Sequence, residues 1–210
     1  MGLVSEVQRL KKLNADQAKK ITILEDRVSD MEQYSRMNDL VINGLKTKHR
    51  TYARAAAAAA EETAGGSTEP STAESETLEQ QVLEYLESKD ITVARRDSIE
   101  ACHILPSKIK GAIPAIIIRF TNRKDKNALL KQASNLKGSK VYINEHLTKK
   151  NAAIAKRARA LSMAKKIEWT WTWNCKVFIK QLGSTPEQQK ISIIRDISEL
   201  DKYDDEETQD

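Results

Sequence analysis

Apolar side chains recur along the first 38 residues at the spacing of a coiled coil. Heptad position d holds Leu3, Leu10, Gln17, Leu24 and Met31, and position a holds Val7, Asn14, Ile21 and Val28. β-Branched residues at position a with Leu at position d favour two parallel strands. The pattern predicts one long helix that pairs with copies of itself through these side chains, as a dimer or a trimer.

The charged positions beside that stripe agree with parallel pairing. In a parallel coiled coil, position g of one heptad meets position e of the next heptad on the partner helix. Opposite charges meet in the pairs Glu6–Lys11, Lys20–Glu25 and Arg27–Glu32. The alternative is a single amphipathic helix packed on its own domain, which does not account for this charge pairing.

Residues 39–147 alternate short β-branched runs with helical spacing. The expected elements are a strand at Leu40–Asn43, a helix at 76–89, strands at Ser98–Ile104 and Pro114–Phe120, a helix at Lys124–Asn135 and a strand at Val141–Asn144. A flexible insertion at 46–75, rich in Ala and then in Gly, Ser, Thr, Glu and Pro, follows the first strand. This β-α-β-β-α-β order predicts a ferredoxin-like domain of the RRM type within an α+β protein.

A smaller α/β unit at 148–203 completes the expected architecture. Thr148 caps a helix that runs to about Ala164, and a tryptophan-bearing strand and the strand Lys176–Lys180 follow it. A last helix is expected to begin at a cap formed by Thr185, Pro186 and Gln188, and to carry Ile191, Ile194, Ile197 and Leu200. The acidic end at 204–210 is expected to be disordered.

The three tryptophans of the chain, Trp169, Trp171 and Trp173, alternate with threonines, which places all three on one face of a strand. A two-residue turn at Asn174-Cys175 adds three residues of the next strand to this face: Lys176, Phe178 and Lys180. The face could stack nucleobases, at about 1–3 kcal/mol for each base. It could equally be core, packed against the Ile154–Leu161 side of the preceding helix.

Charge is distributed unevenly, although the formal net charge is only +5. Residues 121–180 hold 15 Lys and Arg against 3 Asp and Glu, whereas residues 181–210 hold 3 against 9. A basic block of this density favours a polyanionic partner, either a nucleic acid such as single-stranded RNA or DNA or an anionic membrane, and the acidic tail could shield it when no ligand is bound. The plain alternative is a solvated surface with a solubilising tail.

The residue types that catalysis or metal binding needs do not come together in the sequence. His49, His103 and His146 have no motif partner, Cys102 and Cys175 have neither disulfide nor zinc spacing, and no phosphate-binding glycine loop is present. No apolar run approaches the ~20 residues of a membrane span. We expect a protein that is not an enzyme, with no cofactor, no metal, no small-molecule substrate and no membrane partner.

The predicted RRM-like sheet departs from the usual base-stacking design. A typical RRM stacks bases on aromatic side chains of its first and third strands. Here those strands offer Val41, Ile116 and Ile118. Binding is therefore expected to run through the phosphate backbone, with little sequence preference.

Four segments resemble, in the same order, the first open-reading-frame protein of LINE-type non-LTR retrotransposons. They are Arg36–Leu45 directly after the coiled coil, Ile99–Ile104, Ile116–Phe120 with the basic Asn122–Lys126, and Val141–Lys150 with Trp171–Lys180. The last segment is also similar to the C-terminal domain of the baculoviral FP protein. The resemblance covers about residues 1–45 and 76–203.

This resemblance implies a non-catalytic RNA-binding protein that self-assembles, acts as a nucleic-acid chaperone and works in a ribonucleoprotein particle in the cytoplasm or the nucleus. It also implies RNA contacts at Arg119, Arg157 and Arg159. Together with the basic and aromatic residues above, the candidate nucleic-acid site comprises Arg119, Arg123, Lys124, Lys126, Lys149, Lys150, Lys156, Arg157, Arg159, Lys165, Lys166, Trp169, Trp171, Trp173, Lys176 and Lys180. The family's coiled coil commonly forms trimers, whereas the residues at a and d of this chain favour a dimer.

Two other functions fit part of the same evidence. A coiled-coil scaffold or adaptor could bind an acidic protein partner through the basic face, and it would then bind any polyanion without a tryptophan signal. An anionic membrane surface fits less well, because the basic helix presents only a thin apolar stripe.

Overall fold

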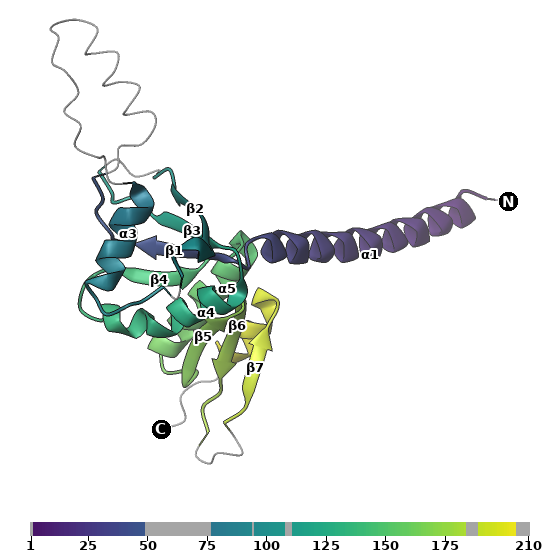
Figure 1. Ribbon diagram of the computed structural model, residues 1–210. Helices are drawn as coiled ribbons and strands as arrows, with labels where there is room; N and C mark the ends of the chain where they lie inside the picture. Colours follow the sequence, from purple (N-terminus) through teal and green to yellow (C-terminus); the bar gives the residue numbers. More distant parts are fainter. Residues whose placement is uncertain (1, 49–76, 94, 108–110, 184–188, 205–210) are drawn as a thin grey trace, which may run out of the picture. The chain divides into compact units, whose positions relative to one another are not determined.

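The computed structural model describes residues 2–48, 77–93, 95–107, 111–183 and 189–204 of the 210-residue chain (Figure 1). It is a mixed α+β protein with one long helix and two antiparallel sheets. Its residues group into two compact units. We call Asn38–His146 the central unit, and Met1–Met37 with Leu147–Asp210 the terminal unit. Most of the predicted insertion, the predicted cap at Thr185 and nearly all of the predicted disordered end lie outside the described residues.

The central unit is built on a four-stranded antiparallel sheet. Its elements follow the order β1 (Asp39–Asn43), α3 (Leu78–Glu87), β2 (Ile99–Ile104), β3 (Ile116–Phe120), α4 (Arg123–Lys131) and β4 (Tyr142–Glu145). Short 3-10 helices at Arg96–Ser98 and Gln132–Leu136 precede β2 and follow α4. The strands lie side by side in the order β2-β3-β1-β4. The predicted order of strands and helices is confirmed for this unit.

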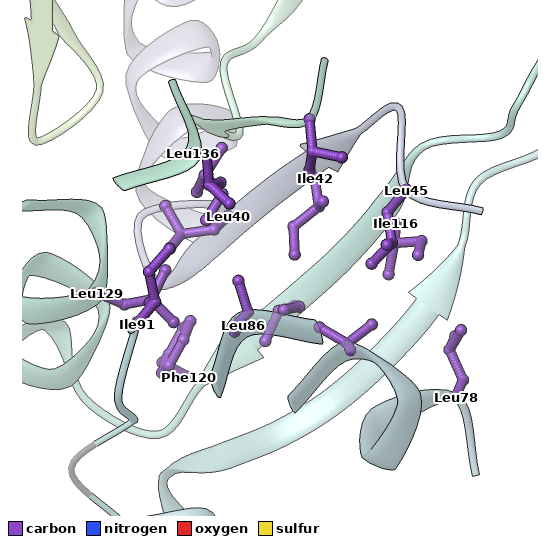
Figure 2. Close-up of a cluster of buried hydrophobic side chains, with 14 residues drawn as sticks. Leu40, Ile42, Leu45, Leu78, Leu86, Ile91, Ile116, Phe120, Leu129 and Leu136 are labelled. Atoms are coloured by element: carbon purple, nitrogen blue, oxygen red, sulfur yellow. The ribbon is translucent and has the colours of Figure 1, made fainter. Parts of the chain in front are cut away.

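Alternation along the strands of the central unit sends one set of side chains beneath its two helices. The strand residues of this set, each at most 7% exposed, are Leu40, Ile42, Ile116, Ile118, Phe120 and Ile143. They pack in one hydrophobic cluster with Leu78, Val82 and Leu86 of α3 and Leu129 of α4 (Figure 2). The apolar side chains that recur every two residues in the strands and every three to four residues in the helices therefore pack together in a single core.

Side-chain caps set where helices begin. The Thr77 side chain accepts a hydrogen bond from the backbone N–H of Gln80, and the Gln80 side chain accepts one from the backbone N–H of Thr77, which makes a capping box at the start of α3. Asn122 caps α4, and Thr148 caps α5 (Lys149–Met163) as predicted. Each cap satisfies a backbone donor of the first turn that has no partner within the helix.

The terminal unit combines the two ends of the chain. Its first element is α1 (Leu3–Ser35), a single helix of 33 residues. After α5 come β5 (Trp169–Trp173), β6 (Lys176–Lys180), β7 (Ile191–Ile194) and the 3-10 helix η3 (Ile197–Tyr203). The three strands form a sheet in chain order. Its core contains Ile154, Ala155, Ala158, Leu161, Ile167, Val177, Ile179, Ile194, Leu200 and Tyr203.

The chain from residue 191 onward differs from the prediction. The expected helix through 191–200 is wrong, since the structure forms β7 and then η3. Ile194 lies opposite Val177 of β6, and Ile193 lies opposite Phe178. Three isoleucines within four residues fit the pleated surface of a strand, and pairing with β6 satisfies the backbone of β7. Apolar residues three positions apart are compatible with an α-helix and also with a strand followed by a 3-10 helix. The pairing with β6 therefore determines which of the two forms.

Candidate nucleic-acid interface

The tryptophan hairpin forms in the predicted register. Trp173 lies opposite Lys176, Trp171 opposite Phe178 and Trp169 opposite Lys180. The two turn residues, Asn174 and Cys175, have positive φ angles of 51° and 59°. Positive φ at both central residues is the geometry of the two-residue turn that matches the twist of a hairpin. Residues directly opposite share a face, so the aromatic and lysine side chains stand together.

The tryptophans do not form the core of the terminal unit. Val177 and Ile179, which alternate with the aromatic set on β6, pack against α5 and are at most 1% exposed. No tryptophan belongs to that hydrophobic cluster. Trp169 is 63% exposed, and Trp171 and Trp173 are half-buried. Because α5 covers the Val177 face, the alternation of the strands directs the three rings to the other face.

One aromatic pair on that face is already ordered. The rings of Trp171 and Phe178 are stacked, with centroids 5.5 Å apart and planes inclined by 6°. This distance lies in the range that offset aromatic pairs prefer. The pair crosses from β5 to β6 at the middle of the hairpin, so the centre of the face has a fixed aromatic surface.

Residues of β7 extend the aromatic face beyond what the sequence predicted. Ile191 lies opposite Lys180 and Ile193 opposite Phe178, which places both isoleucines on the face of the tryptophans. Ile191 is 57% exposed and Ile193 is 38% exposed. These two residues were missed because the segment was expected to be helical. The alternation of Ile191, Ser192 and Ile193 was the available signal.

The basic residues of α5 point in a different direction from the aromatic face. Ile154, Ala158 and Leu161 pack into the core, whereas Lys156 and Arg159 lie on the solvent side of the helix and are exposed. Lys149, at the helix start, is exposed as well, as is Lys165 just after the helix. Since α5 and the tryptophans occupy opposite faces of the sheet, the basic helix and the aromatic face are two surfaces and not one site.

Acidic side chains hold one flank of α5. Arg157 forms ion pairs with Asp201, at 2.6 Å, and with Asp204, and the Lys166 ammonium donates a hydrogen bond to the backbone oxygen of Asp204. Hydrogen bonds to Asp204 and then to Asp201 raise the pKa of Arg157 above its ordinary value. Within the described residues, Arg157 is thus one basic residue that acidic side chains of η3 and the residue after it neutralise.

Lys150 lies between acids from two segments. Its ammonium donates to Asp26 of α1 at 3.0 Å and lies 3.9 Å from Asp196, just before η3. The hydrogen bond to Asp26 outweighs desolvation and raises the pKa of Lys150. Lys150 is therefore engaged within the terminal unit, unlike Lys156, which has no ion pair with any described residue.

In the central unit, a buried carboxylate orients Arg119. The guanidinium donates to Asp39 from Nε at 2.8 Å and from a terminal nitrogen at 3.3 Å, and His146 Nδ1 lies 3.0 Å from the same carboxylate. Burial raises the pKa of Asp39, but the hydrogen bonds from His146 and Arg119 outweigh it and leave the pKa below its ordinary value. The Arg119 side chain remains 42% exposed. It is thus held in place while one side stays open to solvent.

Lys126 corrects the predicted list of phosphate contacts. Its side chain is 1% exposed, and its ammonium donates to Glu145 of β4 at 2.6 Å inside the central unit. A lysine enclosed in this way cannot reach a phosphate. Its neighbours Arg123 and Lys124 are exposed at the start of α4 and remain candidates for phosphate contacts. Lys180 is paired with Glu168 at 2.7 Å but is only partly buried.

The open face of the central sheet is poor in aromatic residues. Val41, Ile117 and Arg119 lie on it, whereas Ile116 and Ile118, which were expected to be offered to a ligand, are buried in the core. Tyr142 of β4, which lies opposite Asn43, is 63% exposed and is the Trp, Tyr or Phe residue of this face among the described strands, and the exposed His103 of β2 lies on the same face opposite Ile117. Tyr142 was missed because only the first and third strands were considered.

Helix α1 is attached to the terminal unit on the side opposite its apolar stripe. Gln33 accepts hydrogen bonds from the Thr148 backbone N–H and from the Asn151 side chain, both at 2.9 Å, and Asp26 pairs with Lys150. Both α1 residues occupy heptad position f, which faces away from positions a and d. The apolar residues at a and d, Leu3, Val7, Leu10, Ile21, Leu24, Val28 and Met31, are 43–86% exposed. Two shallow hollows follow this stripe, lined among others by Val7 with Leu10 and by Leu24 with Val28.

Other chemistry is limited in the part of the chain that the structure describes. Burial, and then Glu79, raise the pKa of Cys102 to about 12, so this thiol stays protonated and weakly nucleophilic at neutral pH. No group of three or more His, Cys, Asp or Glu among the described residues could hold a metal ion. None of the described helices is both long and apolar enough to cross a membrane.

A scan against models of known protein families and a search of curated proteins found no match to this chain.

Proposed function

We propose that this protein is a non-catalytic, single-stranded nucleic-acid-binding protein, with RNA as its ligand, that self-assembles through α1 and acts as a chaperone in a ribonucleoprotein of the retrotransposon type, in the cytoplasm or the nucleus. The observation that carries the proposal is the solvent side of α5. Lys149, Lys156 and Arg159 are exposed there and have no ion pair with a described residue. Unpaired cations on one helix side are suited to replacing the counterions of a phosphate backbone.

We further propose that the central unit is a ferredoxin-like domain of the RRM type. The strand order β2-β3-β1-β4 and the two helices packed on one face support this assignment. The open face then binds without base stacking in the RRM manner. Arg119, oriented by Asp39, is its best placed cation for a phosphate.

The self-assembly proposal rests on the two sides of α1. The f side is used for contacts within the chain, and the a and d side remains exposed. Burial of that stripe between two or three copies would remove its apolar surface from water. Avidity between linked copies would then strengthen weak binding by each copy. Sedimentation of Leu10→Asn/Leu24→Asn should show loss of the oligomer, and an unchanged oligomer would contradict the role of the stripe.

The nucleic-acid proposal is tested by anisotropy titration of a labelled single-stranded RNA at several salt concentrations. Arg159→Ala should weaken binding to unrelated sequences alike and reduce the salt slope by about 0.7–1 unit. Lys19→Ala is the matched control, because Lys19 is an exposed cation on the f side of α1. An unchanged slope in Arg159→Ala, or an equal loss in Lys19→Ala, would remove α5 from the binding surface.

One observation favours a second candidate, a coiled-coil scaffold that binds an acidic protein partner. Arg157 already pairs with two carboxylates of its own chain, so the flank of α5 fits acidic side chains. Competition separates the two functions. If nucleic acid is the ligand, polyglutamate should displace labelled RNA poorly. If the scaffold function is correct, polyglutamate should displace labelled RNA as well as unlabelled RNA does.

A further inference from the structure

We propose that the open face of the sheet β5-β6-β7 binds unpaired bases of a single strand, and that it is a contact separate from α5. We call this face the aromatic platform and define it as Trp169, Trp171, Trp173, Lys176, Phe178, Lys180, Ile191 and Ile193. The inference rests on the proposed nucleic-acid function and adds to it the chemical group that is recognised. It assigns bases to the platform and leaves the phosphates of another stretch of strand to α5.

The strand registers bring these eight residues to one face. Three of the five cross-strand pairs between β5 and β6 lie on this face, and Ile191 and Ile193 lie opposite Lys180 and Phe178 of β6. The residues between them, such as Val177 and Ile179, fill the core beneath α5. The platform therefore spans all three strands of the sheet and is not a property of the tryptophan strand alone.

The platform shows large apolar surface that folding of the terminal unit does not use. Trp169 is 63% exposed, and Ile191 and Ile193 are 57% and 38% exposed. Contiguous apolar surface of this kind on one face marks an interaction site more often than a solvated surface. The isoleucines at one edge and the exposed indole at the other give a ligand apolar contacts across the width of the sheet.

The spacing of the rings suits flat ligands arranged in a row. Alternate residues of a strand are about 7 Å apart, which is about twice the 3.4 Å step between neighbouring nucleotides of stacked DNA. An extended single strand can therefore bring successive bases to successive rings. Trp171 is already stacked on Phe178, so the central ring loses little freedom when a base arrives.

The charge of the platform favours a nucleic acid over a protein. Its charged members are Lys176 and Lys180, and its described strands contribute no carboxylate to this face. Lys176 is exposed and forms no ion pair with a described residue. Lys180 forms an ion pair with Glu168, the residue just before β5. Aromatic rings flanked by lysines are the combination that single-strand-binding proteins use for bases and phosphates. An apolar protein partner would gain nothing from the two ammonium groups.

The test uses tryptophan fluorescence, because all three tryptophans of the chain belong to the platform. The full-length protein is titrated with a short oligouridine and with an abasic strand that has the same phosphates. We expect saturable quenching with oligouridine, little quenching with the abasic strand, and tighter binding of oligouridine. Trp169→Leu should weaken oligouridine binding by roughly 5- to 150-fold and leave abasic binding nearly unchanged. Trp169→Phe, which retains a flat ring, should restore most of the loss.

Three results would overturn the platform. Equal affinity for both strands with unchanged tryptophan emission means that phosphates alone are bound, so the platform fails while the proposed function stands. Absence of salt-dependent binding to either strand removes the proposed function and the platform with it. An emission shift that depends on protein concentration and not on oligonucleotide assigns the face to a second copy of the chain. Trp169 is exposed, so its substitution leaves the core intact, and circular dichroism checks this.

Discussion

The two sheets of this protein share one design and differ in what they leave open. Each is antiparallel, and each has one face packed on helices in a continuous core. The open face of the central sheet carries aliphatic residues, an arginine held by a carboxylate, His103 and Tyr142. The open face of the terminal sheet carries the aromatic platform. Similar architecture therefore supports different surfaces, because alternate strand positions can change without disturbing the core.

The sheets also differ in where their ionic groups lie. The central unit encloses Lys126 and Glu145 and buries Asp39, so part of its charge serves its own structure. In the terminal unit, the ion pairs of Lys180 and Arg157 lie at the surface, where a phosphate could replace the carboxylate. Fewer basic residues of the central unit can therefore contact a phosphate than its sequence contains, because Lys126 is enclosed. We also expect different responses to mutation in the two units.

The largest effect is expected from the buried pair of the central unit. Lys126→Met removes the ammonium that pairs with the enclosed Glu145 carboxylate, and breaking a buried pair costs about 3–5 kcal/mol of unfolding free energy. Lys180→Met, which breaks a surface pair, should cost about 0–1 kcal/mol. Denaturant unfolding followed by circular dichroism measures both.

Two further variants control this experiment. Lys124→Met alters an exposed lysine of the same helix and should have little effect. Lys126→Met/Glu145→Leu removes both charges and should recover much of the loss, because an apolar pair of similar volume replaces the ionic one. A Lys126→Met variant as stable as Lys124→Met would contradict the enclosed ion pair.

Asp39 should give a smaller effect that depends on pH. The pKa of Asp39 is held below its ordinary value near 3.8. Its contribution is therefore complete well above that value and is lost as the pH falls through the lowered pKa. At pH 7, Asp39→Asn should cost about 1–2 kcal/mol, less than the full value of hydrogen bonds to a charged group because Arg119 is partly exposed.

The difference between wild type and Asp39→Asn should narrow as the pH falls below 3.8 and vanish once the carboxyl is protonated. Unfolding at pH 7 and at successively lower pH values measures it. Asp97→Asn, at an exposed acid 3.8 Å from Arg95, should show no such dependence. A constant difference across the range would mean that the ionised form of Asp39 is not what stabilises the unit.

In the terminal unit, removing surface acids should strengthen binding. Asp201→Asn/Asp204→Asn frees the guanidinium of Arg157 and removes two negative charges beside α5. Each further phosphate that the protein neutralises makes the salt slope for a single strand steeper by about 0.7 unit, so we expect tighter RNA binding and a slope steeper by about 0.7 unit, from the one freed arginine. Asp16→Asn/Glu84→Gln removes the same number of exposed charges elsewhere and should change the slope less. Weaker binding by the first variant would contradict a role for Arg157.

Much of this arrangement could be predicted from local sequence patterns. The strand–helix order of the central unit follows from hydrophobic periods of two and of three to four, and the register of the tryptophan hairpin follows from alternation plus a two-residue turn. Both depend on residues close together in the chain. The core-facing side of α5 was likewise visible in the spacing of Ile154, Ala158 and Leu161.

What could not be predicted depends on residues far apart in the sequence. Lys126 looked like one more cation in a basic helix, and only the position of Glu145 on β4 shows that it is enclosed. The spacing of the isoleucines at 191–194 fits a helix as well as a strand, and only the pairing of β7 with β6 shows that it is a strand. Sequence also left open which face of the hairpin is core, and this is decided by the packing of Val177 and Ile179 on α5.

The smallest effect should come from the aromatic residue on the open face of the central sheet. Tyr142 and Trp169 are equally exposed, at 63% each, so they form a matched pair for oligouridine binding. Tyr142 lies opposite Asn43, with no second ring across the strand, whereas Trp169 belongs to a face with three further aromatic side chains and two lysines. A lone ring offers a base one contact, and a row of rings holds a strand through several. Tyr142→Leu should therefore change oligouridine affinity by less than about twofold, near the error of such measurements, while Trp169→Leu weakens it strongly. A comparable loss in Tyr142→Leu would show that the central sheet also stacks bases, and the contrast between the two open faces would be wrong.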